Sequence, residues 1–204
     1  MSRADHVAGY YRFHAPIYDL TRWTFLFHRR RAVEWTGLDG PPRRVLEVGC
    51  GTGINLVRLA HLWPHAEIVG VDLSGAMLAR ARARLAPFGD RVRLHEGAYG
   101  VDDTFTGWPD ALLFSYSLTM MGEALPSVLD AARRDLAEGG RVIAVDFDDT
   151  PSRTFRHWMR ANHVDVDGRV LRSLHDRFHT RRQETGQAFG GLWSTFLFAG
   201  SPRR

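Results

Sequence analysis

The chain has 204 residues, of which 44% are hydrophobic and 25% are charged, a composition typical of a single globular α/β domain. It has no apolar run near the roughly 20 residues that span a bilayer, its polar start lacks the apolar core of a signal peptide, and its one cysteine, Cys50, excludes an internal disulfide, so we expect a cytoplasmic protein. The net charge is +4 and all 27 residues counted as Lys or Arg are arginine. They are spread along the chain without a separate basic arm, which argues against a nucleic-acid partner.

Residues 1–40 are expected to form a helical segment ahead of the first strand. Pro16 is placed to begin the second of two helices. The residues that would share one face of this helix are Ile17, Leu20, Trp23, Thr24 and Phe27. A helix packed over the sheet edge and a lid that turns tyrosines toward a substrate both fit this pattern.

The centre of the sequence pattern is a glycine-rich turn. The apolar run 45–48 leads into Gly49, Gly51 and Gly53, and helical spacing follows over 54–60. This order predicts a strand, a tight turn and a helix whose free N–H groups point at a ligand. The third glycine of the dinucleotide fingerprint would fall at Ile54, so the pattern is E-x-G-x-G-x-G, starting at Glu47.

The remaining elements alternate between strands and helices. A buried strand over 67–71 ends beside Asp72, and Ser74 is expected to cap the next helix. Further strands are expected at 91–95, 110–114 and 141–147, helices at 75–86, 123–138 and 151–163, and an antiparallel pair at 178–186 and 192–199. We therefore predict one Rossmann-like α/β domain over 1–204, with a mostly parallel seven-stranded sheet of order 3-2-1-4-5-7-6 and helices on both faces. It comprises an N-terminal helical lid (1–40), a core (41–149), and a C-terminal helix with an antiparallel hairpin (150–204).

The glycine turn and Asp72 together resemble motif I and the following acidic residue of class I S-adenosylmethionine-dependent methyltransferases. The resemblance covers about 43–149 and implies S-adenosylmethionine as cofactor, S-adenosylhomocysteine as product, and Asp72 as acceptor for the ribose hydroxyls. The implied cofactor-binding residues are Glu47, Gly49, Cys50, Gly51, Thr52, Gly53, Asn55, Asp72, Leu73, Met77, Gly97, Ala98, Tyr99, Ser115, Tyr116 and Ser117. Ala98 stands where such enzymes often carry Asp, so adenine recognition falls to backbone groups, Glu96 or Tyr99. We interpret Cys50 as a space-filler in the turn.

A narrower similarity lies in 17–22, 115–120, 145–148 and the region around 163. These short stretches resemble bacterial N-methyltransferases of betaine-lipid synthesis, which methylate the amino group of diacylglyceryl homoserine. The resemblance implies transfer of methyl to an amine nitrogen of a small molecule or a lipid head group. The arginine-flanked aromatic N-terminal segment permits peripheral membrane contact, and a monomer or a homodimer is expected.

Methyl transfer needs an acceptor held in line more than it needs a strong base, so we look for positioning side chains. Tyr18 and Tyr116 are candidates to position the amine, since aromatic faces attract methylated ammonium. His14 and His163 are candidate bases. No pattern brings metal ligands onto one face, so no metal is expected.

Several other functions stay open at this stage. They are O-methylation of a specialised metabolite, transfer of the aminocarboxypropyl chain, cofactor binding without catalysis, and an NAD-dependent reaction.

Overall fold

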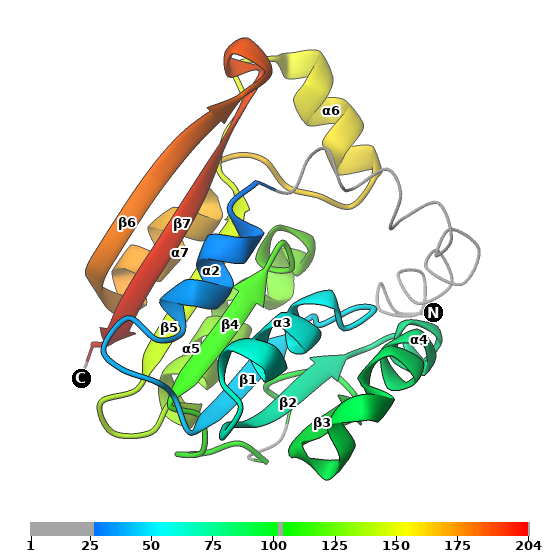
Figure 1. The fold of residues 1–204 in the computed structure, drawn as a ribbon. Helices are drawn as coiled ribbons and strands as arrows, with labels where there is room; N and C mark the ends of the chain where they lie inside the picture. Colours follow the sequence, from blue (N-terminus) through cyan, green and yellow to red (C-terminus); the bar gives the residue numbers. More distant parts are fainter. Residues whose placement is uncertain (1–26, 102–103, 204) are drawn as a thin grey trace.

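The computed structural model describes residues 27–101 and 104–203. They form a seven-stranded sheet of order β3-β2-β1-β4-β5-β7-β6, flanked by helices on both faces (Figure 1). The strands are β1 (Arg44–Val48), β2 (Glu67–Asp72), β3 (Val92–Glu96), β4 (Ala111–Ser115), β5 (Arg141–Phe147), β6 (Phe178–Ala188) and β7 (Trp193–Pro202). Strands β1 to β5 pair in parallel, while β7 runs antiparallel to both β5 and β6. The predicted fold class and strand order are confirmed.

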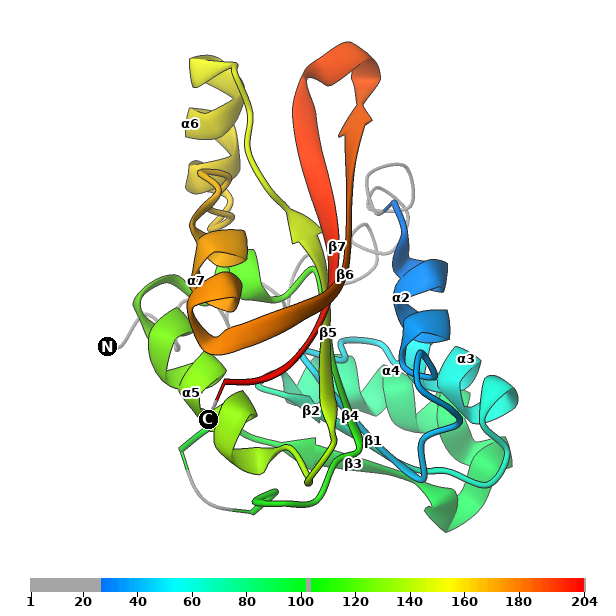
Figure 2. The same ribbon diagram turned by 90° about the vertical axis from the view of Figure 1, so that its left-hand side faces the viewer.

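The helices divide between the two faces of the sheet. They are α2 (Arg29–Trp35), α3 (Ile54–Leu62), α4 (Gly75–Leu85), α5 (Leu125–Asp135), α6 (Arg153–Ala161) and α7 (Arg169–Arg177). Figure 2 shows α2, α3 and α4 on one side of the sheet and α5 and α7 on the other, while α6 rises at the end of the molecule where the β6–β7 hairpin turns. Helix α7 was not expected from the sequence, because most of its nine residues are polar or charged and only Val170 and Leu174 are buried.

Two apolar clusters hold these layers together. On β1, Val45 packs into the cluster under α2, α3 and α4, whereas Leu46 and Val48 pack into the cluster under α5 and α7. Central parallel strands are buried on both faces, which explains why they read as continuous apolar runs rather than alternating ones. Ligands therefore have to approach these strands at their ends, where polar side chains stand.

Local signals place the helix starts that frame the carboxyl edge of the sheet. Ser74 caps α4, where its Oγ accepts the N–H of Met77 at 3.4 Å, as predicted. Ser152 caps α6 in the same way through the N–H of Phe155 at 3.2 Å. Both caps satisfy amide groups that the first helical turn leaves without a partner.

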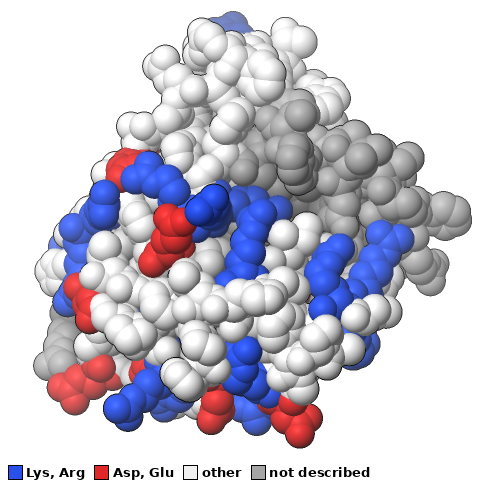
Figure 3. Space-filling view, viewed as in Figure 1, with Lys and Arg blue, Asp and Glu red and all other residues white. Residues whose placement is uncertain are grey.

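None of the helices in the described part of the chain is both long and apolar enough to cross a membrane. Figure 3 shows that basic and acidic side chains are interspersed over the lower part of the face seen in Figure 1.

Candidate functional site

The turn between β1 and α3 has left-handed backbone at each of its three glycines, with φ of 74° at Gly49, 55° at Gly51 and 77° at Gly53. A Cβ on Gly49 would lie 2.6 Å from the Cβ of Ser117, so this position has no room for a side chain. A Cβ on Gly51 would meet nothing within 4 Å. The turn thus presents open main chain at the carboxyl edge, in front of the N-terminus of α3.

Asp72 stands at the end of β2, beside this turn. Its Oδ2 accepts the N–H of Gly51 at 2.7 Å, and its Oδ1 accepts the N–H of Ser74 at 2.9 Å. Burial raises the pKa of Asp72, and these two amide bonds oppose the rise. The backbone of Leu73 also donates a hydrogen bond to Asp72. Three of the roughly four acceptor positions of the carboxylate are therefore used, and about one stays open to a hydroxyl of a ligand.

Glu47 lies on β1, just before the glycine turn, and is buried, with 1% of its surface exposed. Its Oε1 accepts the amide of Asn55 at 2.7 Å, whereas its buried Oε2 has no hydrogen-bond partner within the described ranges. Burial raises the pKa of Glu47 to about 7, with the Asn55 hydrogen bond and the nearby charges of Arg29 and Arg58 acting in the opposite direction. A buried acceptor without a donor is unfavourable by itself, so this oxygen fits a cationic or N–H group of a bound molecule.

Arg29 was not assigned to this site from the sequence. It starts α2, and its charge reaches Glu47 only because α2 packs against α3. No local pattern signals such an approach between segments so far apart in the chain.

Cys50 turns its side chain away from the open side of the turn. A Cβ on Gly70 of β2 would lie 2.8 Å from its Sγ, so the thiol fills the space above that glycine. Burial raises the pKa of the Cys50 thiol, which keeps it protonated and unreactive. Thr52 is buried within the same turn.

The carboxyl edge continues along β3. The N–H of Gly97 donates to the carbonyl of Asp72 at 3.1 Å. The carboxylate of Glu96 lies over the start of α4, since a Cβ on Gly75 would be 2.7 Å from its Oε1. Ala98 is exposed beside them.

Two apolar side chains complete this part of the edge. Leu73 is 48% exposed and directly follows Asp72, and Met77 is buried in the first turn of α4. An exposed leucine beside a carboxylate offers one apolar and one polar contact to the same ligand.

Tyr99 makes a different contact from the one considered for it above. Its hydroxyl donates to Asp135 Oδ2 at 2.8 Å, and its ring packs beside Phe105 and Phe114. Burial and the Asp135 carboxylate raise the pKa of Tyr99. The hydroxyl is therefore engaged with α5. Of the groups considered for adenine recognition, backbone groups and Glu96 remain.

Tyr116 follows β4 and links three segments. It is 3% exposed, its hydroxyl donates to the backbone carbonyl of Phe27 at 2.8 Å, and its ring meets Phe147 edge-on at 5.0 Å. Its φ of 56° is left-handed, which is unfavourable for a bulky residue and typical of functional positions. Its hydroxyl therefore ties the chain just before α2 to the end of β4.

The neighbours of Tyr116 differ in their contacts. Ser117 Oγ donates to the carbonyl of Val48 at 3.0 Å and packs against Gly49, so it couples β4 to the glycine turn. Ser115 Oγ is buried and makes no hydrogen bond to any described residue.

The end of β5 carries three acidic residues that differ in burial and in their partners. Asp146 is fully buried, and its Oδ1 accepts the hydroxyl of Thr119 at 2.6 Å. Asp148 is partly buried, which raises its pKa, while a bond from Ser194 opposes the rise. Asp149 is exposed and pairs with Arg156 at 2.9 Å. Only Asp148 is partly buried and outside an ion pair with a described residue.

Of the proposed catalytic side chains, Tyr116 and His163 lie within the described residues, whereas Tyr18 and His14 lie outside them. His163 follows α6 with a left-handed φ of 61°. It comes two residues before Asp165, whose N–H donates to the carbonyl of Thr119 at 2.9 Å. This bond draws the loop after α6 toward the end of β4.

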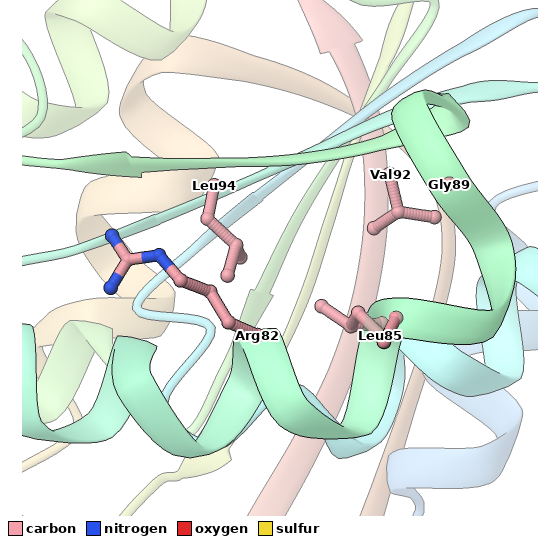
Figure 4. A pocket seen from close by; sticks show the side chains of 6 residues that line it. Arg82, Leu85, Gly89, Val92 and Leu94 are labelled. Atoms are coloured by element: carbon pink, nitrogen blue, oxygen red, sulfur yellow. The ribbon is translucent and has the colours of Figure 1, made fainter.

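An open pocket of about 230 Å³ lies elsewhere, between α4 and β3 (Figure 4). It is lined by Arg82, Leu85, Ala86, Gly89, Val92 and Leu94. These residues sit toward the end of α4 and the start of β3, away from the carboxyl edge, so the pocket is not part of the site. No three His, Cys, Asp or Glu side chains in the described ranges are grouped so as to hold a metal ion.

Comparisons with known proteins address the same part of the chain. Residues 45–140 match the family model described as methyltransferase domain. A demethylmenaquinone methyltransferase of Thermus thermophilus is 32% identical over 146 residues, which are 69% of this chain and 66% of the relative. A protein-L-isoaspartate O-methyltransferase of Methylorubrum populi is 40% identical over 104 residues, which are 50% of this chain and 44% of the relative. The chain thus spans less than two thirds of the length of these curated relatives.

Solved structures show the same fold at low identity. N-methyltransferase NodS from Bradyrhizobium japonicum WM9, in complex with S-adenosylhomocysteine, has a TM-score of 0.71 at 18% identity, covering 87% of each chain. The 1,6-didemethyltoxoflavin-N1-methyltransferase of Burkholderia thailandensis has a TM-score of 0.74 at 16% identity, covering 100% of this chain and 92% of the other. Residues 45–140 therefore match a methyltransferase-domain model, and the chain shares the Rossmann-like fold of these solved methyltransferases.

Proposed function

We propose that the chain transfers a methyl group from S-adenosylmethionine to an amine nitrogen of a small molecule or a lipid head group. The observation that carries this proposal is the pairing of the Tyr116 and Phe147 rings, 5.0 Å apart, at the ends of β4 and β5, which we call the acceptor edge. The partly buried Asp148 directly follows Phe147 in the chain. Aromatic rings and a carboxylate are the groups that favour a substituted ammonium. Two neighbours in fold are named as N-methyltransferases, which supports the same acceptor class.

We further propose that the cofactor lies across the glycine turn. The open Gly51, the exposed Leu73 and the remaining acceptor position of Asp72 fit its adenosine, and the unpaired Glu47 Oε2 fits its ammonium group. The residues assigned to it on the β1, β2 and α4 side are Glu47, Gly49, Cys50, Gly51, Thr52, Gly53, Asn55, Asp72, Leu73 and Met77. Those on the β3 and β4 side are Gly97, Ala98, Tyr99, Ser115, Tyr116 and Ser117, where Tyr99 contributes through its backbone.

When bound, the cofactor supplies an electrophilic methyl group on a sulfonium sulfur. The chain's own residues then have to orient the acceptor and exclude water, which in favourable cases supplies up to ~7–11 kcal/mol of the acceleration. Tyr116 and Phe147 lie together at the acceptor edge. The neutral nitrogen attacks the methyl carbon with its lone pair, and we assign Asp148 to stabilise the positive charge that the nitrogen gains as the bond to the methyl group forms. His163 is the described candidate to accept the proton that the nitrogen loses.

Calorimetric titration with S-adenosylmethionine and S-adenosylhomocysteine tests the cofactor site. We expect saturable binding that Asp72→Ala weakens, and we expect Asp90→Ala, an exposed aspartate beyond α4, to bind like the wild type. Absence of binding to both compounds would refute the proposal.

Mass spectrometry after incubation with amines, phenols and carboxylates tests the acceptor. A one-methyl increment on amines alone is the expected result. Methylation of an isoaspartyl peptide instead would assign the activity of the relatives that carry that name. An aminocarboxypropyl increment, or cofactor binding without turnover on any acceptor class, would overturn methyl transfer.

A further inference from the structure

The turn of the β6–β7 hairpin is unusually apolar for an exposed loop. From Thr185 to Pro202 the chain has no charged residue. Within the hairpin tip, which we define as residues 188–193, Phe189 is 61% exposed and Leu192 is 38% exposed. The ring of Phe189 contacts that of Trp193 at 4.8 Å, yet most of the Phe189 surface stays exposed.

The backbone of Phe189 is left-handed, with φ of 50°, and the next two residues are Gly190 and Gly191 at 68° and 91°. Glycine adopts this conformation without strain, but a residue with a large side chain does not. A strained backbone is normally retained for a reason other than stability. At Phe189 the strain accompanies an aromatic ring that faces solvent.

The hairpin tip continues into a wider apolar surface. Phe155 of α6 stacks on Trp193 with ring centroids 5.1 Å apart, and Phe27 meets Phe189 edge-on at 6.4 Å. Trp158 of α6 is 55% exposed and Phe27 is 41% exposed. Seven large apolar side chains are exposed in the described part of the chain, and four of them lie here. We call Phe27, Trp158, Phe189 and Leu192 the apex.

Shape and charge point to one kind of partner. Figures 1 and 2 both show the hairpin tip and α6 projecting at the same end of the molecule, and Figure 3 shows few charged side chains there. Between Arg153 and His163 the chain carries three arginines and no acidic residue. Two of these arginines form ion pairs with residues outside this segment, Arg156 with Asp149 and Arg160 with Asp165. Arg153 is exposed and forms no ion pair with a described residue. A projecting apolar surface next to an exposed arginine fits a membrane interface better than a concave small-molecule pocket.

We propose that the apex docks onto a bilayer that contains anionic lipid, with Phe189 and Trp158 entering the interface and Arg153 near the head groups. Aromatic rings prefer the membrane–water interface, and a cationic side chain next to them adds attraction to anionic lipid. The carboxyl ends of the parallel strands open toward the same end of the molecule. Docking therefore brings the acceptor edge close to the lipid surface, whichever molecule is methylated.

Co-sedimentation of the full chain with vesicles tests the proposal. We expect binding to vesicles of three parts phosphatidylcholine and one part phosphatidylglycerol, weakening with salt, and little binding to pure phosphatidylcholine. The double variant Phe189→Ser with Trp158→Ser should lower the partition coefficient by about tenfold or more. Leu62→Ser is the matched control, since Leu62 is 41% exposed on α3, and its partition should stay within about twofold of the wild type.

Arg153→Gln should reduce the difference between the two vesicle compositions. Absence of binding to anionic vesicles, or equal binding by the wild type and the double variant, would overturn the proposal. So would a wild-type dimer in sedimentation velocity that the double variant converts to monomer, because the apex would then be an interface between copies. Titration of every variant with S-adenosylhomocysteine reports on its fold and cofactor site, so failure of the proposed methylation is distinguished from failure of docking.

Discussion

Replacement of Glu47 by Gln removes a buried titrating carboxyl while keeping an acceptor for Asn55. Burial raises the pKa of Glu47 from 4.5 to about 7, so the folded protein holds this proton more tightly than the unfolded chain does. Below pH 4.5 both states are protonated and the group has no effect on stability. Between pH 4.5 and about 7 the unfolded state ionises first, and above pH 7 the full penalty on the folded state is present.

The size of this penalty follows from the pKa difference. At ~1.4 kcal/mol for each pH unit between the folded and unfolded pKa, it reaches about 3 kcal/mol above pH 7. The glutamine of the variant does not titrate, so its own effects on packing and hydrogen bonding are the same at every pH. The free energy of unfolding of the wild type should therefore fall relative to that of the variant by about 2.5 kcal/mol between pH 5 and pH 8, because part of the penalty is already present at pH 5.

Urea unfolding of the cofactor-free wild type and Glu47→Gln at several pH values measures this difference. Other groups with raised pKa values, such as Asp148, are present in both proteins and cancel in the comparison. A constant difference in unfolding free energy across the pH range would show that Glu47 is not the buried, unpaired acid described here. The variant should also bind S-adenosylhomocysteine more weakly at pH 8, if the Oε2 of Glu47 receives the ammonium group.

Three further substitutions test individual contacts. Asp72→Asn should weaken S-adenosylhomocysteine binding by about tenfold or more in calorimetry, since an amide offers one acceptor atom in place of two; unchanged affinity would remove Asp72 from the cofactor site. Gly49→Ala should destabilise the protein by about 2 kcal/mol or more in urea unfolding, because Gly49 has a positive φ and a Cβ there would approach the Cβ of Ser117. Adding Ser117→Gly should recover part of this loss. No recovery would show that the approach to Ser117 is not the cause. Tyr116→Phe should lose about 1 kcal/mol from the bond to the Phe27 carbonyl, and the same unfolding midpoint as the wild type would contradict that bond.

Much of the fold follows from local patterns. An apolar run, three glycines at alternate positions and helical spacing can form only a strand, a tight turn and a helix, so the region 45–60 was predictable from periodicity and backbone stereochemistry. The alternation of strands and helices then predicts a parallel sheet covered by helices, and the fixed hand of the crossovers limits how the strands can be ordered. The caps at Ser74 and Ser152 are local as well, since each involves an amide three residues away.

The state of each site residue depends on contacts that no local pattern encodes. Tyr99 binds Asp135 instead of facing the carboxyl edge, and Tyr116 binds the backbone of Phe27, far away in the chain. The pKa of Glu47 depends on how completely the layers of the sheet and helices exclude water from it. Periodicity and spacing describe neighbours within a few residues, whereas desolvation and partner choice arise only when distant segments pack together. The amino-acid sequence by itself therefore identifies the glycine turn. Only the tertiary structure decides which side chains around that turn keep a free hydrogen-bonding group for a ligand.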